Sequence, residues 1–315
     1  MDFESQYMFA TSDGQLWLVV RDGNGAWTNL QQLNFSYVGP HGVVSPCGPA
    51  NNISAASLVY PQADYFFTNQ NGEFWHVFRL QDGSWTPVDD VRSILGIAFI
   101  PAWRVMDSAA CVGDGVANFI FFNEDGTLRH ATRNELFSPV TWGGPDDLTS
   151  ALGIANSVTG VGAAGASGAP AQYMFTTSDG RLWYTTTTQP SGNIWTAPLD
   201  VRAQFRTDPG EVLGVSGACA DFQQSPTGIT IQTQWLFVTS IGHAWHTIRH
   251  YDGTWTLTDF SGQFGIPDPP AGTYFHWGIA GVGNGGTGST FFAFAPPDGR
   301  LRTQSGYPTA PGPLR

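Results

Sequence analysis

Between residues 55 and 91, hydrophobic and polar positions follow the pattern of four short strands. Residues 55–60 (AASLVY) are small and apolar, and 63–68 (ADYFFT) alternate into a turn at 69–72 (NQNG). Residues 73–79 (EFWHVFR) alternate again, and an Asp-Gly turn leads into 84–88 (SWTPV). Alternation is typical of strands, and Asn-Gly and Asp-Gly supply the positive φ that hairpin turns need. This stretch therefore predicts four antiparallel strands joined by hairpins.

The same pattern returns along the whole chain. A turn glycine is followed, two residues later, by Leu, Phe or Ala and then directly by Trp or Arg. This pattern occurs six times, with glycines at 14, 72, 126, 180, 242 and 299. Successive turn glycines are 58, 54, 54, 62 and 57 residues apart. Repeats of this length, each holding a small sheet, are typical of propellers. We therefore predict an all-β chain, a six-bladed β-propeller of four-stranded antiparallel blades, forming a single domain over residues 1–315. How the first and last blades close stays open.

The first strand of each predicted blade is poor in bulky side chains. Examples are 108–113 (SAACVG), 158–162 (VTGVG), 216–219 (SGAC) and 278–283 (GIAGVG). Small residues suit inner strands that converge on a central channel. The two Trp residues of each full repeat are then expected to fill the space between neighbouring blades.

Composition and charge narrow the range of partners. Charged residues make up 12% of the chain and aromatic residues 14%, with 39 Gly and 21 Pro, which favours short strands and tight turns over helices. A net charge of −12 argues against nucleic acid or an anionic membrane as partner, because both attract basic surfaces. The chain shows no run that could span a membrane and no signal-peptide pattern at Met1. Glycosylation sequons at Asn34 and Asn52 are compatible with secretion, and the oligomeric state and localisation stay open.

The cysteines and histidines give no sign of a metal or redox centre. Three widely spaced cysteines, Cys47, Cys111 and Cys219, do not form a disulfide framework, and the last two are expected to be small buried residues of inner strands. A histidine cluster comprises His243, His246 and His250, but strand alternation places His243 and His246 on opposite faces. We expect no metal and no cofactor.

Two repeats carry a longer motif. Residues 75–79 (WHVFR) with 82–88 (DGSWTPV), and 245–249 (WHTIR) with 252–256 (DGTWT), resemble the blade signature of bacterial and fungal β-propeller lectins of the fucose- and galactose-binding kind. The resemblance extends over nearly the whole chain. It implies a propeller fold and a carbohydrate-binding, lectin-like function, with a small neutral sugar as ligand.

The motif supplies the side chains that hold a neutral sugar. An aromatic ring can stack on the C–H face of a sugar, and Arg or His can hydrogen-bond its hydroxyls. Trp and the Arg four residues later share one face of a strand, while the intervening His faces the next blade. The alternative is that Arg stacks on Trp and covers a blade edge. The candidate ligand-binding residues are Trp75, His76, Arg79, Trp245, His246, Arg249, Trp17 and Arg21.

The repeats are not equal, and this leaves two other functions open. The third copy reads 129–133 (RHATR), the fourth 183–187 (WYTTT) and the sixth 302–305 (RTQS), and Leu18 takes the His place in the first. Hydrolase and phosphate-loop motifs are missing from the text. One alternative is a cofactor-free pericyclase, because this chain resembles in repeat style the lectin-like six-bladed propellers of fungi, a group that includes hetero-Diels–Alderases. Such an enzyme needs one apolar pocket and one cation or hydrogen-bond donor. A third is an interaction propeller without a small ligand. Equivalent pockets favour a lectin, and one divergent pocket favours an enzyme.

Overall fold

The computed structural model describes most of the chain. The described residues are 5–11, 13–21, 26, 28–38, 44–56, 62–97, 103–113, 116–134, 139–166, 168–188, 194–225, 228–264, 278–284, 289–295 and 302–306. They divide into two compact units, Met1–Ser150 and Ala151–Arg315, and each unit is described by itself.

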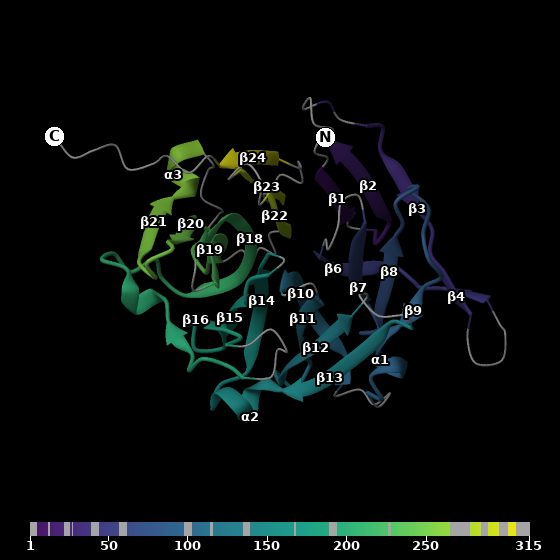
Figure 1. The fold of residues 1–315 in the computed structure, drawn as a ribbon, viewed down its shortest axis with the longest axis horizontal. Coiled ribbons are helices and arrows are strands. Elements are labelled where there is room, and N and C mark those ends of the chain that lie inside the picture. Colours follow the sequence, from purple (N-terminus) through teal and green to yellow (C-terminus); the bar gives the residue numbers. More distant parts are fainter. Residues whose placement is uncertain are drawn as a thin grey trace. The chain divides into compact units, whose positions relative to one another are not determined.

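The first unit contains three antiparallel sheets and a small hairpin (Figure 1). The first sheet comprises β1 (Ser5–Ala10), β2 (Leu16–Arg21) and β3 (Gln31–Leu33), and β4 (Ser36–Val38) pairs with β5 (Val44–Pro46). The second comprises β6 (Ala50–Ala56), β7 (Ala63–Asn69), β8 (Phe74–Arg79) and β9 (Asp89–Asp90), followed by α1 (Val91–Ile94). The third comprises β10 (Val105–Gly113), β11 (Val116–Asn123), β12 (Leu128–Asn134) and β13 (Thr141–Asp147), followed by α2 (Leu148–Leu152).

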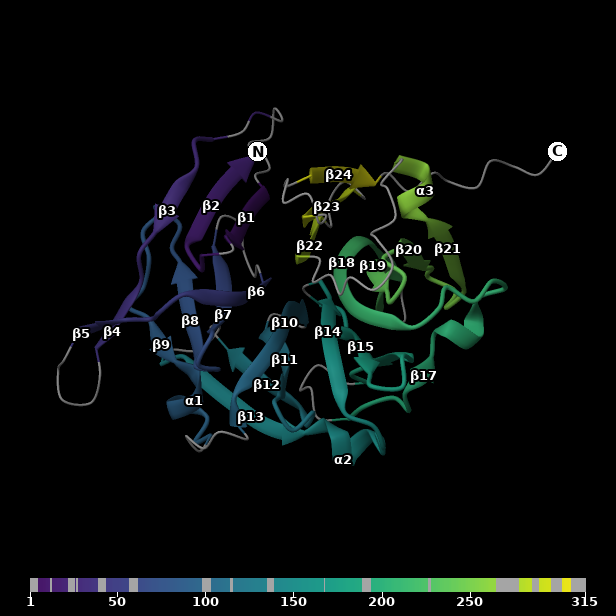
Figure 2. The same cartoon turned by 180° about the vertical axis from the view of Figure 1, so that it is seen from behind.

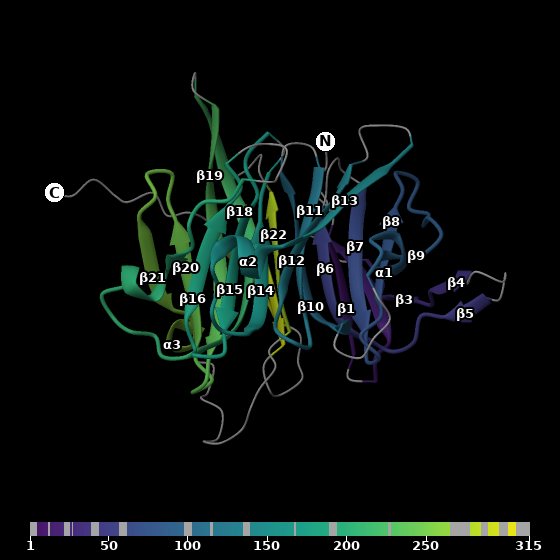
Figure 3. The ribbon, with the colours of Figure 1, turned by 90° about the horizontal axis from the view of Figure 1, so that it is seen from below.

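The second unit repeats this plan. One sheet comprises β14 (Val158–Ala164), β15 (Gln172–Thr177), β16 (Leu182–Thr186) and β17 (Leu199–Asp200), followed by the 3₁₀ helix η2 (Arg202–Gln204). The next comprises β18 (Val212–Ser225), β19 (Gly228–Thr239), β20 (Ala244–Arg249) and β21 (Trp255–Asp259), followed by α3 (Phe260–Phe264). The last comprises β22 (Gly278–Asn284), β23 (Ser289–Ala295) and β24 (Arg302–Gly306). Figure 3 shows the β18–β19 hairpin extending past β20 and β21.

Successive sheets lie side by side through their first strands. In the first unit β6 lies between β1 and β10, and in the second β18 lies between β14 and β22 (Figure 2). Of these strands, β10, β14, β18 and β22 are rich in glycine and alanine, whereas β1 (SQYMFA) is not. At Gly162, an added Cβ would lie 3.1 Å from the backbone of Ser216 on the neighbouring first strand. Small residues therefore allow the close approach of adjacent sheets, as predicted.

The repeated turns are built on glycine. The turn glycines 14, 72, 126, 180 and 242 have φ between 71° and 80°, in the left-handed region that side chains with a Cβ avoid. Space is a second requirement, since a Cβ on Gly72 would come within 2.7 Å of the Cα of Arg104. The sixth predicted turn, at Gly299, lies outside the described residues.

An aspartate ends the outer strand of four sheets and precedes a short helical turn. The Asp90 side chain accepts the N–H of Ser93 at the start of α1, at 3.2 Å. The same i to i+3 bond is made by three further aspartates, Asp147, Asp200 and Asp259. Two residues after each aspartate, a polar side chain returns to the hairpin of its own sheet, as when Arg202 Nη1 donates to the Gly180 carbonyl at 2.8 Å. This recurrent cap was not among our sequence predictions.

The core consists of hydrophobic clusters between neighbouring sheets. One cluster joins the β1–β3 and β6–β9 sheets and includes Trp75, and another joins β6–β9 to β10–β13 around Phe66 and Phe119. In the second unit a cluster joins β14–β17 to β18–β21 around Trp235, with Trp245 and Trp255 packed against it. Trp75, Trp245 and Trp255 therefore fill the space between sheets, as expected, whereas Trp183 lines a pocket.

One strand prediction was wrong and another was displaced. The expected fourth strand at 84–88 reduces to an isolated bridge between Arg79 and Trp85, and β9 forms later, at Asp89–Asp90. Pro87 has no N–H, so a continuous ladder cannot pass through it. The expected first strand at 55–60 is instead β6, which begins at Ala50, and residues 57–60 lie outside the described part of the chain. Within the described residues, no helix has the length and apolar character needed to cross a membrane.

Candidate functional site

Arg249 lies over an aromatic ring of the neighbouring sheet. It ends β20, and its guanidinium carbon is 5.0 Å from the centroid of the Tyr184 ring on β16. Trp255 on β21 pairs with Arg249 in the strand register and contacts Tyr184 edge-on at 5.3 Å. Trp245 belongs to the same hydrophobic cluster as Tyr184, so Trp245 and Arg249 share a face, as strand alternation predicted. We call Tyr184, Trp245, Arg249 and Trp255 the Arg249 group.

The Arg249 group offers hydrogen-bond donors. Arg249 is half-buried and makes no ion pair with a described residue. The indole Nε1 atoms of Trp245 and Trp255 are buried and have no hydrogen-bond partner among the described residues. Burial raises the pKa of Tyr184 to about 12 against the opposing effect of Arg249, so its phenol is protonated near neutral pH. Of these donors, the half-buried guanidinium of Arg249 is the one that a bound molecule with acceptor oxygens could reach.

The first unit has several arginines at the position of Arg249, and they differ in their contacts. Arg79 is half-buried and makes no ion pair with a described residue, whereas Arg133 is buried in an ion pair. Arg133 and Arg249 both follow their turn glycines, Gly126 and Gly242, by seven residues. Arg133 is 6% exposed, and its Nη1 donates to Asp64 Oδ1 at 2.8 Å, whereas no described carboxylate pairs with Arg249. The guanidinium carbon of Arg133 also lies over the Trp142 ring, 5.6 Å from its centroid. Arg133 is buried and paired with Asp64, so its guanidinium links the β10–β13 sheet to the β6–β9 sheet.

Asp64 also holds the predicted site residue His76. His76 Nε2 lies 2.7 Å from Asp64 Oδ1, and His76 Nδ1 lies 3.0 Å from Asp89 Oδ2. Both His76 and Asp64 are 0% exposed. His76 therefore belongs to a buried polar network, and its role toward a ligand stays a prediction.

The other predicted site residues lie at two further places. Trp75 is 1% exposed and packs 4.5 Å from the ring of Tyr37, while Arg79 and Trp85 are half-buried. Trp17 on β2 is half-buried, and Arg21 ends β2 with its side chain outside the described set. These residues belong to the first unit, and the Arg249 group belongs to the second. Their binding roles stay predictions.

Three histidines make the same type of contact, which the sequence analysis did not predict. His76, His130 and His246 each bond to a side-chain oxygen twelve residues earlier, on the preceding strand. For His246 this partner is Gln234 Oε1, at 2.9 Å from Nε2. Burial lowers the pKa of His246 to about 4, so the ring is neutral near neutral pH. A polar residue recurs eight positions before five of the six turn glycines, and this was the available signal.

Tyr184 was also missed, for a different reason. The fourth repeat lacks both the His and the Arg of the motif, so we set it aside. The ring that Arg249 covers nevertheless comes from this repeat, because the group forms between two sheets. A motif confined to one repeat cannot reveal a site assembled from two.

Comparisons with known proteins identify the fold. No protein-family model matches the chain, and no curated protein matches it significantly. A fucose-specific lectin from Aleuria aurantia aligns over 96% of this chain and 90% of its own, with a TM-score of 0.59 and 14% identity. The BP39L lectin from Burkholderia pseudomallei covers 99% of this chain and 80% of its own, with a TM-score of 0.58 and 14% identity. A further structure is described as a fungal lectin with a six-bladed β-propeller fold and a fucose recognition mode. It aligns over 96% of this chain and 91% of its own, with a TM-score of 0.53 and 12% identity.

Identities this low establish the fold alone. The antiparallel sheets found along both units, with their small first strands, are the four-stranded blades of such molecules, two of them seen here with three strands. The chain is an all-β protein with the antiparallel β-propeller fold, and it resembles the fucose-specific β-propeller lectins.

Proposed function

We propose that this chain is a lectin-like, six-bladed propeller that binds a neutral sugar through the Arg249 group. Six repeated turns and six sheets of three or four strands support the blade number. The observation that carries the proposal is a half-buried arginine, unpaired among the described residues, over one aromatic ring and beside another. Such a group gives both a stacking surface and fixed donors.

The chemistry of the group favours sugar hydroxyls. Arg and Trp only donate hydrogen bonds, so the ligand must supply acceptors. An anion would do so as well, but the net charge of −12 makes the surroundings unfavourable for anions. Two similar structures of one protein, a mutant of the Aleuria aurantia lectin, are described as complexes, one with Fucα1-6GlcNAc and one with α-methyl-L-fucoside. We therefore choose methyl α-L-fucoside as the first probe.

The first experiment is calorimetric titration of the whole chain with this fucoside, beside a glycan array. Arg249→Gln is expected to weaken binding by at least about tenfold, because hydrogen bonds from a charged donor contribute roughly 1.5–3 kcal/mol. Trp255→Phe keeps a ring and removes the N–H donor, so a smaller loss is expected. The matched control is Arg206→Gln, an exposed arginine of the same unit. A blank array with folded protein, or equal loss in the control, would refute the proposal.

Two alternative functions stay predictions. The cycloaddition catalyst and the interaction propeller draw support from the unequal repeats, and a blank array would turn attention to them. Secretion is also a proposal, supported by the exposed position of the Asn34 sequon.

A further inference from the structure

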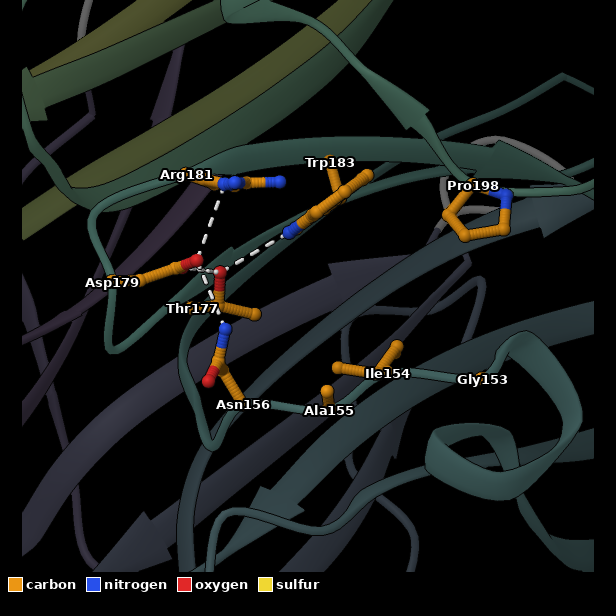
Figure 4. Close-up of a pocket in the computed structure, with 9 residues that line it drawn as sticks. All are labelled: Gly153, Ile154, Ala155, Asn156, Thr177, Asp179, Arg181, Trp183 and Pro198. Carbon is orange, nitrogen blue, oxygen red and sulfur yellow. Dashed lines mark hydrogen bonds and ion pairs between the residues drawn. The ribbon is translucent and has the colours of Figure 1, made fainter.

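A pocket opens on the other side of the strand that carries Tyr184. It lies between the segment after α2, which supplies Ile154 and Asn156, and the β15–β16 turn, which supplies Asp179 and Arg181 (Figure 4). Trp183 on β16 forms one wall. The cavity volume is about 240 Å³, below the range of drug-sized sites, so it suits a ligand of one small ring.

Trp183 is held in place at its polar edge. Its Nε1 donates to Thr177 Oγ1 at 3.1 Å, which fixes the ring plane. The ring is half-buried, and the apolar Ile154 and Pro198 complete the lining near it. The Arg181 guanidinium carbon lies 5.6 Å from the ring centroid. The pocket therefore combines a fixed aromatic wall with a cation at its rim.

Asp179 organises the polar side of the pocket. Thr177 Oγ1 donates to one carboxylate oxygen at 2.6 Å, and Asn156 Nδ2 donates to the other at 2.9 Å. Arg181 Nε pairs with that second oxygen at 3.2 Å. Figure 4 shows these side chains converging on Asp179. Asp179 is thus a positioning residue that aims its two neighbours.

The groups left for a ligand are a donor and an acceptor. Arg181 uses Nε for Asp179, and its side chain is 52% exposed, so its Nη atoms remain available. Asn156 uses its amide nitrogen, so its Oδ1 remains to accept. The charges of Asp179 and Arg181 balance, and a donor beside an acceptor matches a hydroxyl group, which can both accept and donate.

From this geometry we infer a second binding site, in which Trp183 stacks on the C–H face of a neutral sugar ring. Arg181 and Asn156 bind adjacent hydroxyls of that ring. The inference goes beyond the Arg249 group, because Trp183 and Tyr184 are consecutive residues of β16 and face opposite sides of the sheet. One strand thus presents a ligand-binding ring on each face.

The test uses the whole chain labelled with 5-fluorotryptophan, with the Trp183 resonance assigned through Trp183→Phe. The probes are methyl α-L-fucoside, methyl β-D-galactoside and sodium glucuronate, each at millimolar concentration. We expect a neutral glycoside to shift the Trp183 resonance, and Arg181→Gln to weaken that binding by about tenfold. Arg206→Gln is the matched control.

Arg249→Gln separates the two sites. The Trp183 shift is expected to persist in this variant even where binding at the Arg249 group is lost. No shift with either neutral glycoside, a shift with glucuronate alone, or a response unchanged by Arg181→Gln would overturn the inference. Failure of the Arg249 group alone would leave the Trp183 response in place.

Discussion

At the level of single residues, the histidine of the motif makes different contacts in different repeats, according to its neighbours. His76 lies between Asp64 and Asp89, whereas His246 has the neutral Gln234 as partner. The sequence predicted the face on which both histidines lie, because alternation fixes it. It could not predict their burial or their partners, since both depend on how the preceding strand is registered.

His246 predicts a loss of stability in acid. Its pKa of about 4 in the folded chain lies below the ordinary 6.5, so the unfolded chain binds this proton first as the pH falls. The stabilisation is complete above pH 6.5 and is lost toward pH 4, by at most about 1.4 kcal/mol per pH unit. Urea unfolding at pH 7 and pH 5 should show a smaller drop for His246→Gln than for the parent chain. Equal drops would contradict the assignment.

At the level of elements, the turns were predictable and the outer strands were not. Asp-Gly and Asn-Gly turns rely on local backbone chemistry, which the sequence displays directly. The outer strand of the second sheet depends on pairing with β8 around Pro87. The local sequence wrongly predicted this strand at 84–88. The aspartate caps are a local signal too, and Asp-Val-Arg at 90–92 and 200–202 displayed it.

The cap at α1 gives a stability prediction. Asp90→Ala removes the acceptor for the Ser93 N–H and should lower the free energy of unfolding by about 1 kcal/mol. Asp90→Asn keeps a side-chain oxygen at the same place, so this variant should retain most of the stabilisation that Asp90→Ala loses. Denaturant titration of both variants measures the difference. Equal destabilisation by Ala and Asn would show that the charge of Asp90, and not its capping bond, is what matters.

At the level of the whole molecule, the repeats differ in their contacts as well as in their sequence. Asp64 and Arg133 fill one position between sheets with a buried ion pair, and the corresponding Arg249 is left without a described carboxylate. The unequal motif copies already indicated that few sites would bind. They did not point to Tyr184 or Trp183, because the fourth repeat lacks the His and the Arg of the longer motif.

This divergence predicts low valence. If each of the six repeats formed an equivalent pocket, a calorimetric titration would give about six sugars per chain. The Asp64–Arg133 pair already closes one such position, since breaking a buried ion pair to admit a sugar would leave a charge uncompensated, at about 3–5 kcal/mol. We expect one or two sugars per chain, with the count falling by one in Arg249→Gln. Opening the closed position with Asp64→Asn should not restore a site, because Arg133 would remain buried at 6% exposure. A stoichiometry near six would mean that the closed pairs open on binding, and that the differences between repeats are structural and not functional.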